Sequence, residues 1–174
     1  GKEYTRRATE LTKADKTYEV TMTLGQTSTT GDDEGEKTAV SDTVPTKEAV
    51  LGALAYFTGD IMQVPPAFSA MKINGKRAYE LAREGKPVEL EARPATIYSA
   101  DLTSYDYPIV TFTSRVSSGT YIRSLVEDIG EHLSTGAYMS DLRRTTVGKF
   151  TIDSALEVES LNAEVLQENL MEIA

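Results

Sequence analysis

Apolar and polar side chains alternate along residues 17–25, and this period of two constrains the fold more than any other feature. In an extended chain, successive side chains point to opposite sides. One side would then carry the apolar set Tyr18, Val20, Met22 and Leu24. The pattern predicts a strand with one buried face, which needs neighbouring strands and a covering layer.

The apolar period changes to that of a helix in two other places. After Pro45, Thr46 is placed to cap a helix that ends near Gly59. Its apolar residues are Val50, Leu51, Leu54 and Phe57. A second helix is predicted from Thr120 to Gly136, with one apolar face made of Ile122, Leu125, Val126, Ile129 and Leu133.

The rest of the chain supplies strands and connections. Residues 95–103 and 108–116 predict a hairpin, and residues 145–152 predict a further strand. Residues 26–39 are polar and acidic and are interpreted as a long loop, whereas the acidic tail from Asp153 is interpreted as helical. This order of elements predicts an α+β fold, in which helices flank a mixed, largely antiparallel sheet.

Residues 61–93 interrupt that pattern with a basic excursion. Pro65 and Pro66 exclude regular structure from residues 62–74, and a short helix is predicted between Gly75 and Gly85. The cations of the excursion are Lys72, Lys76, Arg77, Arg83, Lys86 and Arg93. Aromatic side chains beside cations suit unpaired RNA bases and phosphates. The alternative is a proline-braced loop that covers the core and leaves its cations in solvent.

Composition removes several classes of site. The 174 residues contain no cysteine and one histidine, His132, so disulfides, cysteine zinc sites and metal sites with two imidazoles are excluded. We interpret His132 as structural or exposed. No stretch approaches the ~18 apolar residues of a membrane span. The first 13 residues do not resemble a signal peptide. A cytoplasmic protein without a membrane partner is therefore expected.

A net charge of −9 argues against a nucleic-acid partner, but the charge is uneven. Residues 32–60 carry −5 and residues 150–174 carry −6, which leaves +2 on the other residues. An RNA partner is therefore compatible with the composition.

One short segment combines a glycine turn, the start of a helix, an aromatic side chain and a guanidinium. It is Ser118-Gly119-Thr120-Tyr121-Ile122-Arg123. Helix N-termini favour anions, although such a turn is more often only a helix cap. Arg143 and Arg144 are open to two interpretations, phosphate contact or a surface ion pair.

Taken together, several segments resemble the TruB family of pseudouridine synthases. The order and spacing of the matching segments hold over roughly residues 1–155. They are residues 14–18, 24–25, 57–61, 63–66, 68–72, 75–77, 79–85, 118–123, 127–130, 142–144 and 147–148. The resemblance implies a pseudouridine synthase fold and the isomerisation of a T-loop uridine in tRNA, without a metal or organic cofactor, by a monomeric parent enzyme.

The resemblance also implies roles for particular residues. Tyr18 matches the tyrosine that stacks on the flipped uracil, and Tyr121 matches a second tyrosine of the pocket. Arg123 matches the arginine that pairs with the catalytic aspartate, and Leu142 matches an apolar residue packed against the base. Residues 61–93 resemble a thumb-like insertion that closes on the T-arm. This insertion lies between two segments of the catalytic domain, residues 1–60 and 94–152, and residues 153–174 form an acidic helical tail. The phosphate-contact candidates are Lys72, Lys76, Arg77, Arg83, Arg143 and Arg144.

The chain departs from the family pattern at the nucleophile. The family's aspartate lies in a Gly-Thr-Leu-Asp-Pro-like loop, and these 174 residues contain no such motif. Asp15, Asp32 and Asp128 do not replace it by motif or position. We expect a C-terminal part of the catalytic domain, without a PUA domain and inactive alone. Two alternatives are a non-catalytic RNA-binding module derived from this fold and a scaffold without an RNA partner.

Overall fold

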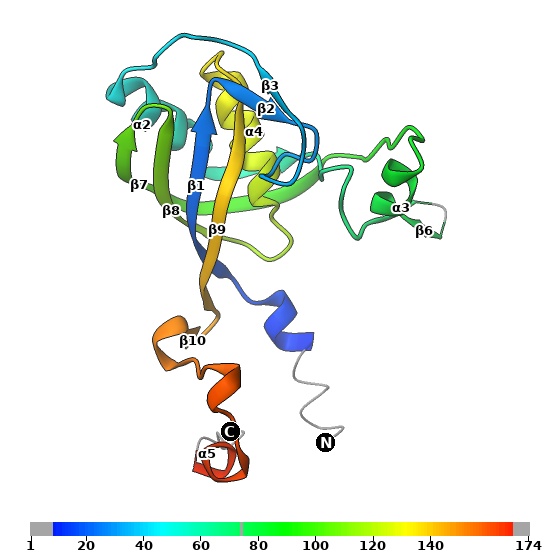
Figure 1. Cartoon of the computed structure of the whole chain (residues 1–174), viewed down its shortest axis with the longest axis vertical. Helices are drawn as coiled ribbons and strands as arrows, with labels where there is room; N and C mark the ends of the chain where they lie inside the picture. Colours follow the sequence, from blue (N-terminus) through cyan, green and yellow to red (C-terminus); the bar gives the residue numbers. More distant parts are fainter. Residues whose placement is uncertain (1–8, 74, 169–174) are drawn as a thin grey trace.

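A six-stranded antiparallel sheet forms the body of the protein (Figure 1). The computed structural model describes residues 9–73 and 75–168. The strand order is β10-β9-β1-β8-β7-β4. The strands are β1 (Lys16–Leu24), β4 (Gly59–Gln63), β7 (Arg93–Asp106), β8 (Ile109–Val116), β9 (Ala137–Val147) and β10 (Phe150–Thr151). The α+β class and the predicted hairpin, now β7 and β8, are confirmed.

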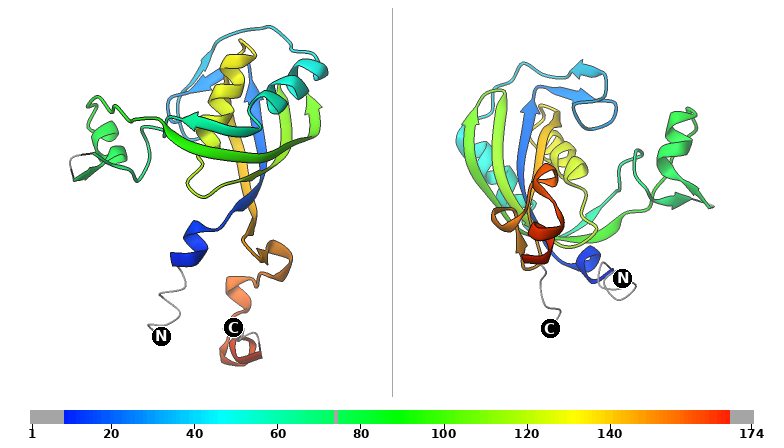
Figure 2. Two further views of the ribbon diagram at one scale, coloured as in Figure 1. Left: turned by 180° about the vertical axis from the view of Figure 1, so that it is seen from behind. Right: turned by 60° about the horizontal axis from the view of Figure 1, so that its bottom comes forward.

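Two helices cover one face of this sheet. Helices α2 (Lys47–Tyr56) and α4 (Ile122–His132) lie on the same side of the strands (Figures 1 and 2). Thr46 caps α2 as predicted, because its Oγ1 accepts a hydrogen bond of 3.2 Å from the backbone N–H of Ala49. No helix in the described part of the chain is long and apolar enough to cross a membrane.

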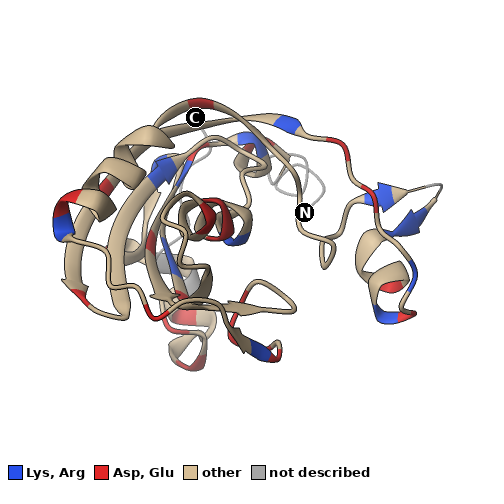
Figure 3. Cartoon of the chain, turned by 90° about the horizontal axis from the view of Figure 1, so that it is seen from above, with Lys and Arg blue, Asp and Glu red and all other residues tan. Residues whose placement is uncertain are grey.

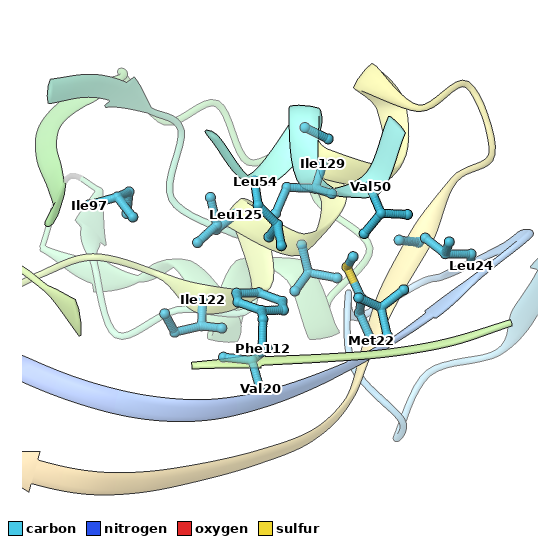
Figure 4. Packing of buried hydrophobic residues seen from close by; sticks show 14 of the residues in the cluster. Val20, Met22, Leu24, Val50, Leu54, Ile97, Phe112, Ile122, Leu125 and Ile129 are labelled. Carbon is cyan, nitrogen blue, oxygen red and sulfur yellow. The ribbon is translucent and has the colours of Figure 1, made fainter. Parts of the chain in front are cut away.

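The core lies between these helices and the inner face of the sheet (Figure 4). The strand side chains alternate as predicted: Val20 lies opposite Phe112 in the register of β1 and β8, and both are fully buried. The core residues are Val20, Met22, Leu24, Val50, Ala53, Leu54, Ile97, Val110, Phe112, Val116, Ile122, Leu125, Val126, Ile129 and Ala137.

Three sequence predictions were wrong in part. Residues 26–39 are not wholly a loop, because β2 (Gln26–Ser28) and β3 (Lys37–Ala39) pair in a small hairpin around an acidic loop, residues 29–36. The last long strand begins at residue 137 rather than 145. The tail holds two 3₁₀ turns, Ile152–Ser154 and Val158–Ser160, before the short helix α5 (Ala163–Glu168).

Residues 64–92 form a segment that projects from the body (Figures 1 and 3). This projecting segment carries β5 (Lys72–Ile73), β6 (Lys76–Arg77) and the short helix α3 (Ala78–Arg83). The irregular stretch predicted for 62–74 is therefore shorter, since β4 runs to Gln63 and β5 begins at Lys72. The helix predicted between Gly75 and Gly85 is confirmed as α3.

Candidate functional site

Arg123, in the first turn of α4, joins three segments that are far apart in the sequence. Its Nη1 donates hydrogen bonds of 3.0 Å to the backbone oxygen of Thr30 and 3.0 Å to Oδ2 of Asp32. Its Nη2 donates one of 2.8 Å to the backbone oxygen of Phe68. The side chains of Arg123 and Asp32 are 20% and 21% exposed, so their ion pair is largely shielded from solvent. One guanidinium therefore connects α4, the acidic loop and the projecting segment.

The start of α4 is held in place by the end of β4. Gln63 is 3% exposed, and its side-chain amide bonds both backbone groups of Tyr121. Its Oε1 accepts from the Tyr121 N–H at 2.8 Å, and its Nε2 donates to the Tyr121 oxygen at 3.0 Å. The Ser124 hydroxyl donates to the backbone oxygen of Val64 at 2.8 Å. The Tyr121 N–H has no partner within the helix, and Gln63 satisfies it, whereas the Tyr121 oxygen also accepts a helical hydrogen bond from the Leu125 N–H at 3.1 Å. Together these contacts hold the start of α4, and with it Arg123, against the end of β4.

The acidic loop is anchored so that Asp32 faces Arg123. The Thr30 hydroxyl donates to Oδ1 of Asp32, and the Met139 N–H of β9 donates to the Gly31 oxygen at 3.0 Å. Gly31 has a φ of +74°, which glycine adopts without strain. A Cβ at Gly31 would lie 2.6 Å from a carboxylate oxygen of Glu127, so the loop packs tightly on α4.

Glu127 lies one helical turn after Arg123 and adds an acidic group that is close to two other carboxylates, those of Asp32 and Asp128. Burial raises the pKa of the Glu127 carboxyl above its ordinary value, and the charges of Asp128 and Asp32 raise it further, whereas Arg123 lowers it. Burial likewise raises the pKa of Asp128. A raised carboxyl pKa means that the folded state binds the proton more tightly than the unfolded one. Both residues therefore lower the stability of the folded state as the pH rises above the ordinary pKa of a carboxyl group.

Tyr18 and Leu142 lie on neighbouring strands at the same face of the sheet. In the register of β1 and β9, Tyr18 is opposite Arg144 and Val20 is opposite Leu142. This is the face that α4 covers, since Val20 is a core residue. Tyr18 packs partly buried against the core, while Leu142 is 37% exposed.

The four predicted pocket residues thus fall into two pairs. Tyr121 and Arg123 share the start of α4, and Tyr18 and Leu142 share the strand pair. Among the residues that the structure describes, no hydrogen bond or ion pair links one pair to the other.

The predicted RNA-binding cations do not form one continuous surface. Lys72, Lys76, Arg77 and Arg83 are all exposed on the projecting segment, where Figure 3 shows basic residues gathered. The guanidinium carbons of Arg77 and Arg83 lie 5.8 and 5.5 Å from the ring centre of Tyr79.

Arg143 and Arg144 are consecutive on β9 and lie on opposite faces of the sheet. Arg143 forms a loose ion pair of 4.0 Å with Glu19, on the face away from the helices. Arg144 lies on the face of Tyr18 and Leu142. Only Arg144 is therefore placed beside the predicted pocket.

Sequence reasoning missed the partners that position Arg123. Asp32 does not match the family's nucleophile, and its role in the structure is that of a counter-ion for Arg123. Gln63 stood in one of the matching segments, but no local pattern revealed that its amide reaches Tyr121. Within the ranges described, no group of three or more His, Cys, Asp or Glu side chains is arranged to hold a metal ion.

Comparisons with known proteins match almost the whole chain. The family described as TruB family pseudouridylate synthase (N terminal domain) matches residues 2–122, and that described as tRNA pseudouridylate synthase B C-terminal domain matches residues 123–173. A protein named tRNA pseudouridine synthase B from Burkholderia mallei (strain NCTC 10247) is 48% identical over 95% of this chain and 55% of its own length. One of the same name from Cupriavidus metallidurans is 47% identical over 93% of this chain and 52% of its own length.

Solved structures give the same fold. The chain resembles one in the crystal structure of a Cbf5-Nop10-Gar1 complex, with a TM-score of 0.63 and 30% identity over 86% of this chain and 35% of the other. It also resembles one in the structure of an H/ACA RNP bound to a substrate RNA containing 2'-deoxyuridine, with a TM-score of 0.58 and 28% identity over 86% and 33%. The chain spans about half the length of the curated relatives it matches.

Proposed function

The chain belongs to the TruB family of pseudouridine synthases, and on that premise we propose that it supplies the uridine pocket and the RNA-clasping segment of a cytoplasmic tRNA pseudouridine synthase. The substrate in this proposal is the uridine of the T-loop of tRNA. The observation that carries it is the set of hydrogen bonds from Arg123, because they join the pocket helix to the projecting segment.

The reaction exchanges one bond to ribose for another. The bond between ribose C1′ and uracil N1 breaks, the uracil turns while it is held, and C1′ bonds to C5. The C5 proton then leaves, and N1 takes up a proton, so that the product is an isomer of the substrate. The base must first leave the stack, which suits a pocket with aromatic side chains. Tyr18 and Tyr121 hold the base, and Leu142 packs against it. A carboxylate bonds to C1′ as the bond from C1′ to N1 breaks, and the bond between C1′ and the carboxylate breaks in turn when C5 bonds to C1′.

Arg123 has donors left for that carboxylate. A guanidinium carries five N–H groups, and three of them are used in the hydrogen bonds to Thr30, Asp32 and Phe68. The other two suit a second carboxylate and favour its charged, nucleophilic form. In this proposal the nucleophile lies in the family's Gly-Thr-Leu-Asp-Pro-like loop, so these 174 residues alone do not turn over.

Release of tritium from uridine C5 tests this assignment, since bond formation at C5 expels that hydrogen. We expect no release from a T-arm hairpin with the chain alone, and release when the chain is fused to a segment that carries the Gly-Thr-Leu-Asp-Pro-like loop. The matched control is the same fusion with that aspartate changed to asparagine. Hairpin binding without release from the intact fusion would instead indicate a non-catalytic RNA-binding module.

The exposed cations of the projecting segment predict how binding depends on salt. Replacing Lys72, Lys76 and Arg77 by alanine removes up to three phosphate contacts, which should make the slope of log affinity against log salt shallower by about two to three. Binding of a T-arm hairpin measured by fluorescence anisotropy at several salt concentrations checks this.

The control for this experiment is the double variant Lys47→Ala/Lys149→Ala. Both lysines are exposed but lie outside the projecting segment. We expect the slope to stay unchanged in the control. If the slope changes equally per removed charge in the two variants, RNA binding depends on the net charge of the protein rather than on the projecting segment.

A further inference from the structure

The acidic loop, residues 29–36, contains four carboxylates and no basic residue. The carboxylates belong to Asp32, Asp33, Glu34 and Glu36. Like charges at this spacing repel one another, so the loop needs a counter-charge to keep a single conformation. The chain places one cation directly after the loop, Lys37, which is the first residue of β3.

The side chain of Lys37 turns back into the loop. Its ammonium donates hydrogen bonds of 2.5 and 2.8 Å to the backbone oxygens of Asp33 and Gly35, and it lies 3.3 Å from Oδ1 of Asp33. The same ammonium lies 4.8 Å from the ring centre of Tyr138, a buried residue of β9. An ammonium has three donors, and these two carbonyl oxygens and one carboxylate can together accept from all of them. Lys37 therefore acts as the internal counter-ion of the loop and fixes residues 33–35 around it.

The stretch that surrounds the Lys37 ammonium also holds Asp32. The N–H of Glu34 donates to Oδ1 of Asp32 at 3.3 Å. Gly35 packs closely on Thr30, since a Cβ at Gly35 would lie 2.6 Å from both the backbone nitrogen and the Oγ1 of Thr30. The Thr30 hydroxyl donates to the same Oδ1 of Asp32. The direction of the Asp32 carboxylate thus depends on the backbone that Lys37 binds.

A path of contacts continues from the loop to Arg123. Oδ2 of Asp32 and the backbone oxygen of Thr30 each accept a hydrogen bond of 3.0 Å from Arg123. Both partners of Arg123 in the acidic loop therefore rely on the conformation that Lys37 holds. If the loop opened, the guanidinium would keep its hydrogen bond to Phe68 but lose the other two.

We propose that Lys37 is a positioning residue for the isomerisation, which acts by keeping the acidic loop closed on Arg123. The inference rests on the proposed function, since it assumes that Arg123 pairs with the nucleophilic carboxylate. Lys37 differs in this from the exposed cations of the projecting segment, because its ammonium is directed at oxygens of the protein itself. Its loss should therefore affect turnover and leave the affinity for the T-arm hairpin almost unchanged.

The guanidinium resonances of Arg123 test the first step in the chain alone. Hydrogen bonds on both terminal nitrogens slow the rotation of a guanidinium, so its N–H groups give separate signals in proton–nitrogen NMR spectra. We expect separate signals in the native chain, assigned by their loss in Arg123→Lys, and averaged signals in Lys37→Met, which keeps the apolar stem without the ammonium. The control Asp33→Asn should keep separate signals, because both backbone oxygens that Lys37 binds remain. Separate signals in Lys37→Met would overturn the proposal.

Turnover by the fusion that carries the aspartate loop tests the second step. Lys37→Met should lower kcat by about 10- to 100-fold, the effect of misplacing a reacting group by about 1 Å, and should change KM by less than about 2-fold. Lys149→Met is the matched control, because the Lys149 ammonium also lies near an aromatic ring, 5.8 Å from the ring centre of Phe150, but outside the loop. It should leave kcat unchanged. A rise in KM at native kcat in Lys37→Met would overturn the proposal.

Gly35→Ala tests the same path with every charge of the loop in place. The added Cβ should push residues 33–35 away from Thr30, so this variant should also average the Arg123 signals and lower kcat. Native signals and native kcat in Gly35→Ala would overturn the path from Lys37 to Arg123. This variant also decides the question if Lys37→Met does not fold, which its melting temperature shows.

The outcomes separate the two proposals. Absence of tritium release from the native fusion would overturn the proposed function and, with it, the role of Lys37 in turnover. Release by the native fusion together with native kcat in Lys37→Met would keep the function and reject Lys37 as a positioning residue.

Discussion

Gly130→Ala should destabilise the chain by about 3 kcal/mol, although alanine is the better helix former, because overpacking against a fixed backbone is costly. Gly130 is a buried residue of α4, and the chain that leaves the helix turns back over it. The N–H groups of Thr135 and Gly136 both donate to the Gly130 oxygen at 3.0 Å. A Cβ at Gly130 would overlap the backbone nitrogen of Ala137 and lie 2.6 Å from the Ala137 Cβ. Urea unfolding followed by circular dichroism measures the loss.

Gly52→Ala is the matched control, since the same substitution meets no obstacle there. Gly52 lies inside α2, and nothing lies within 4 Å of where its Cβ would be. We expect Gly52→Ala to stabilise the chain by about 0.5–1 kcal/mol. Opposite signs for the two variants would show that the close contact between α4 and β9 is real. A stabilising effect of both would contradict the packing of β9 against α4.

Periodicity predicted the elements whose buried face is uninterrupted. The structure contains both the alternation along β1 and the apolar face of α4. Every second residue of Val20–Leu24 in β1 and one side of α4 pack into the same core, so the periodic pattern is unbroken in the sequence. The capping side chain of Thr46 is a similarly local signal.

The first half of β9 escaped prediction because bulges break its alternation. The register pairs Met139 with Met22 but Leu142 with Val20, so three residues on β9 match two on β1. A bulge of this kind shifts the side chains that follow to the other phase. The single-period pattern that defines a strand in sequence is therefore absent from residues 137–144.

The sequence singled out Tyr121 and Arg123 but not the residues that they contact, and the roles of the two residues in a uridine pocket stay a prediction. Tyr121 and Arg123 stand out locally, as an aromatic and a cation at a helix start. Their positioning partners, Gln63 and Asp32, lie 58 and 91 residues away in the sequence. Contacts of that separation depend on how the sheet brings β4 and the acidic loop to α4, which no local pattern contains.

Arg123→Ala should have the largest effect on both structure and function, because it removes three hydrogen bonds at once. Asp32 would then keep a charge that is 21% exposed without its cation. Removing one partner of a buried pair costs about 3–5 kcal/mol, and the partial exposure here reduces the expected loss to about 2–4 kcal/mol. The projecting segment would also lose its bond to α4 through Phe68. We expect urea unfolding to show the loss of stability and the fusion with the aspartate loop to show no tritium release.

Arg123→Lys and Asp32→Asn separate charge from geometry. An ammonium keeps the positive charge but cannot reproduce the planar fork that meets Thr30, Asp32 and Phe68 together, so Arg123→Lys should recover little of the stability. In a double-mutant cycle, Arg123→Ala and Asp32→Asn should be coupled by about 1–3 kcal/mol. Additive effects would mean that the pair does not hold the acidic loop. Arg123 would then act only on the substrate, and Asp32→Asn would leave hairpin binding and tritium release unchanged.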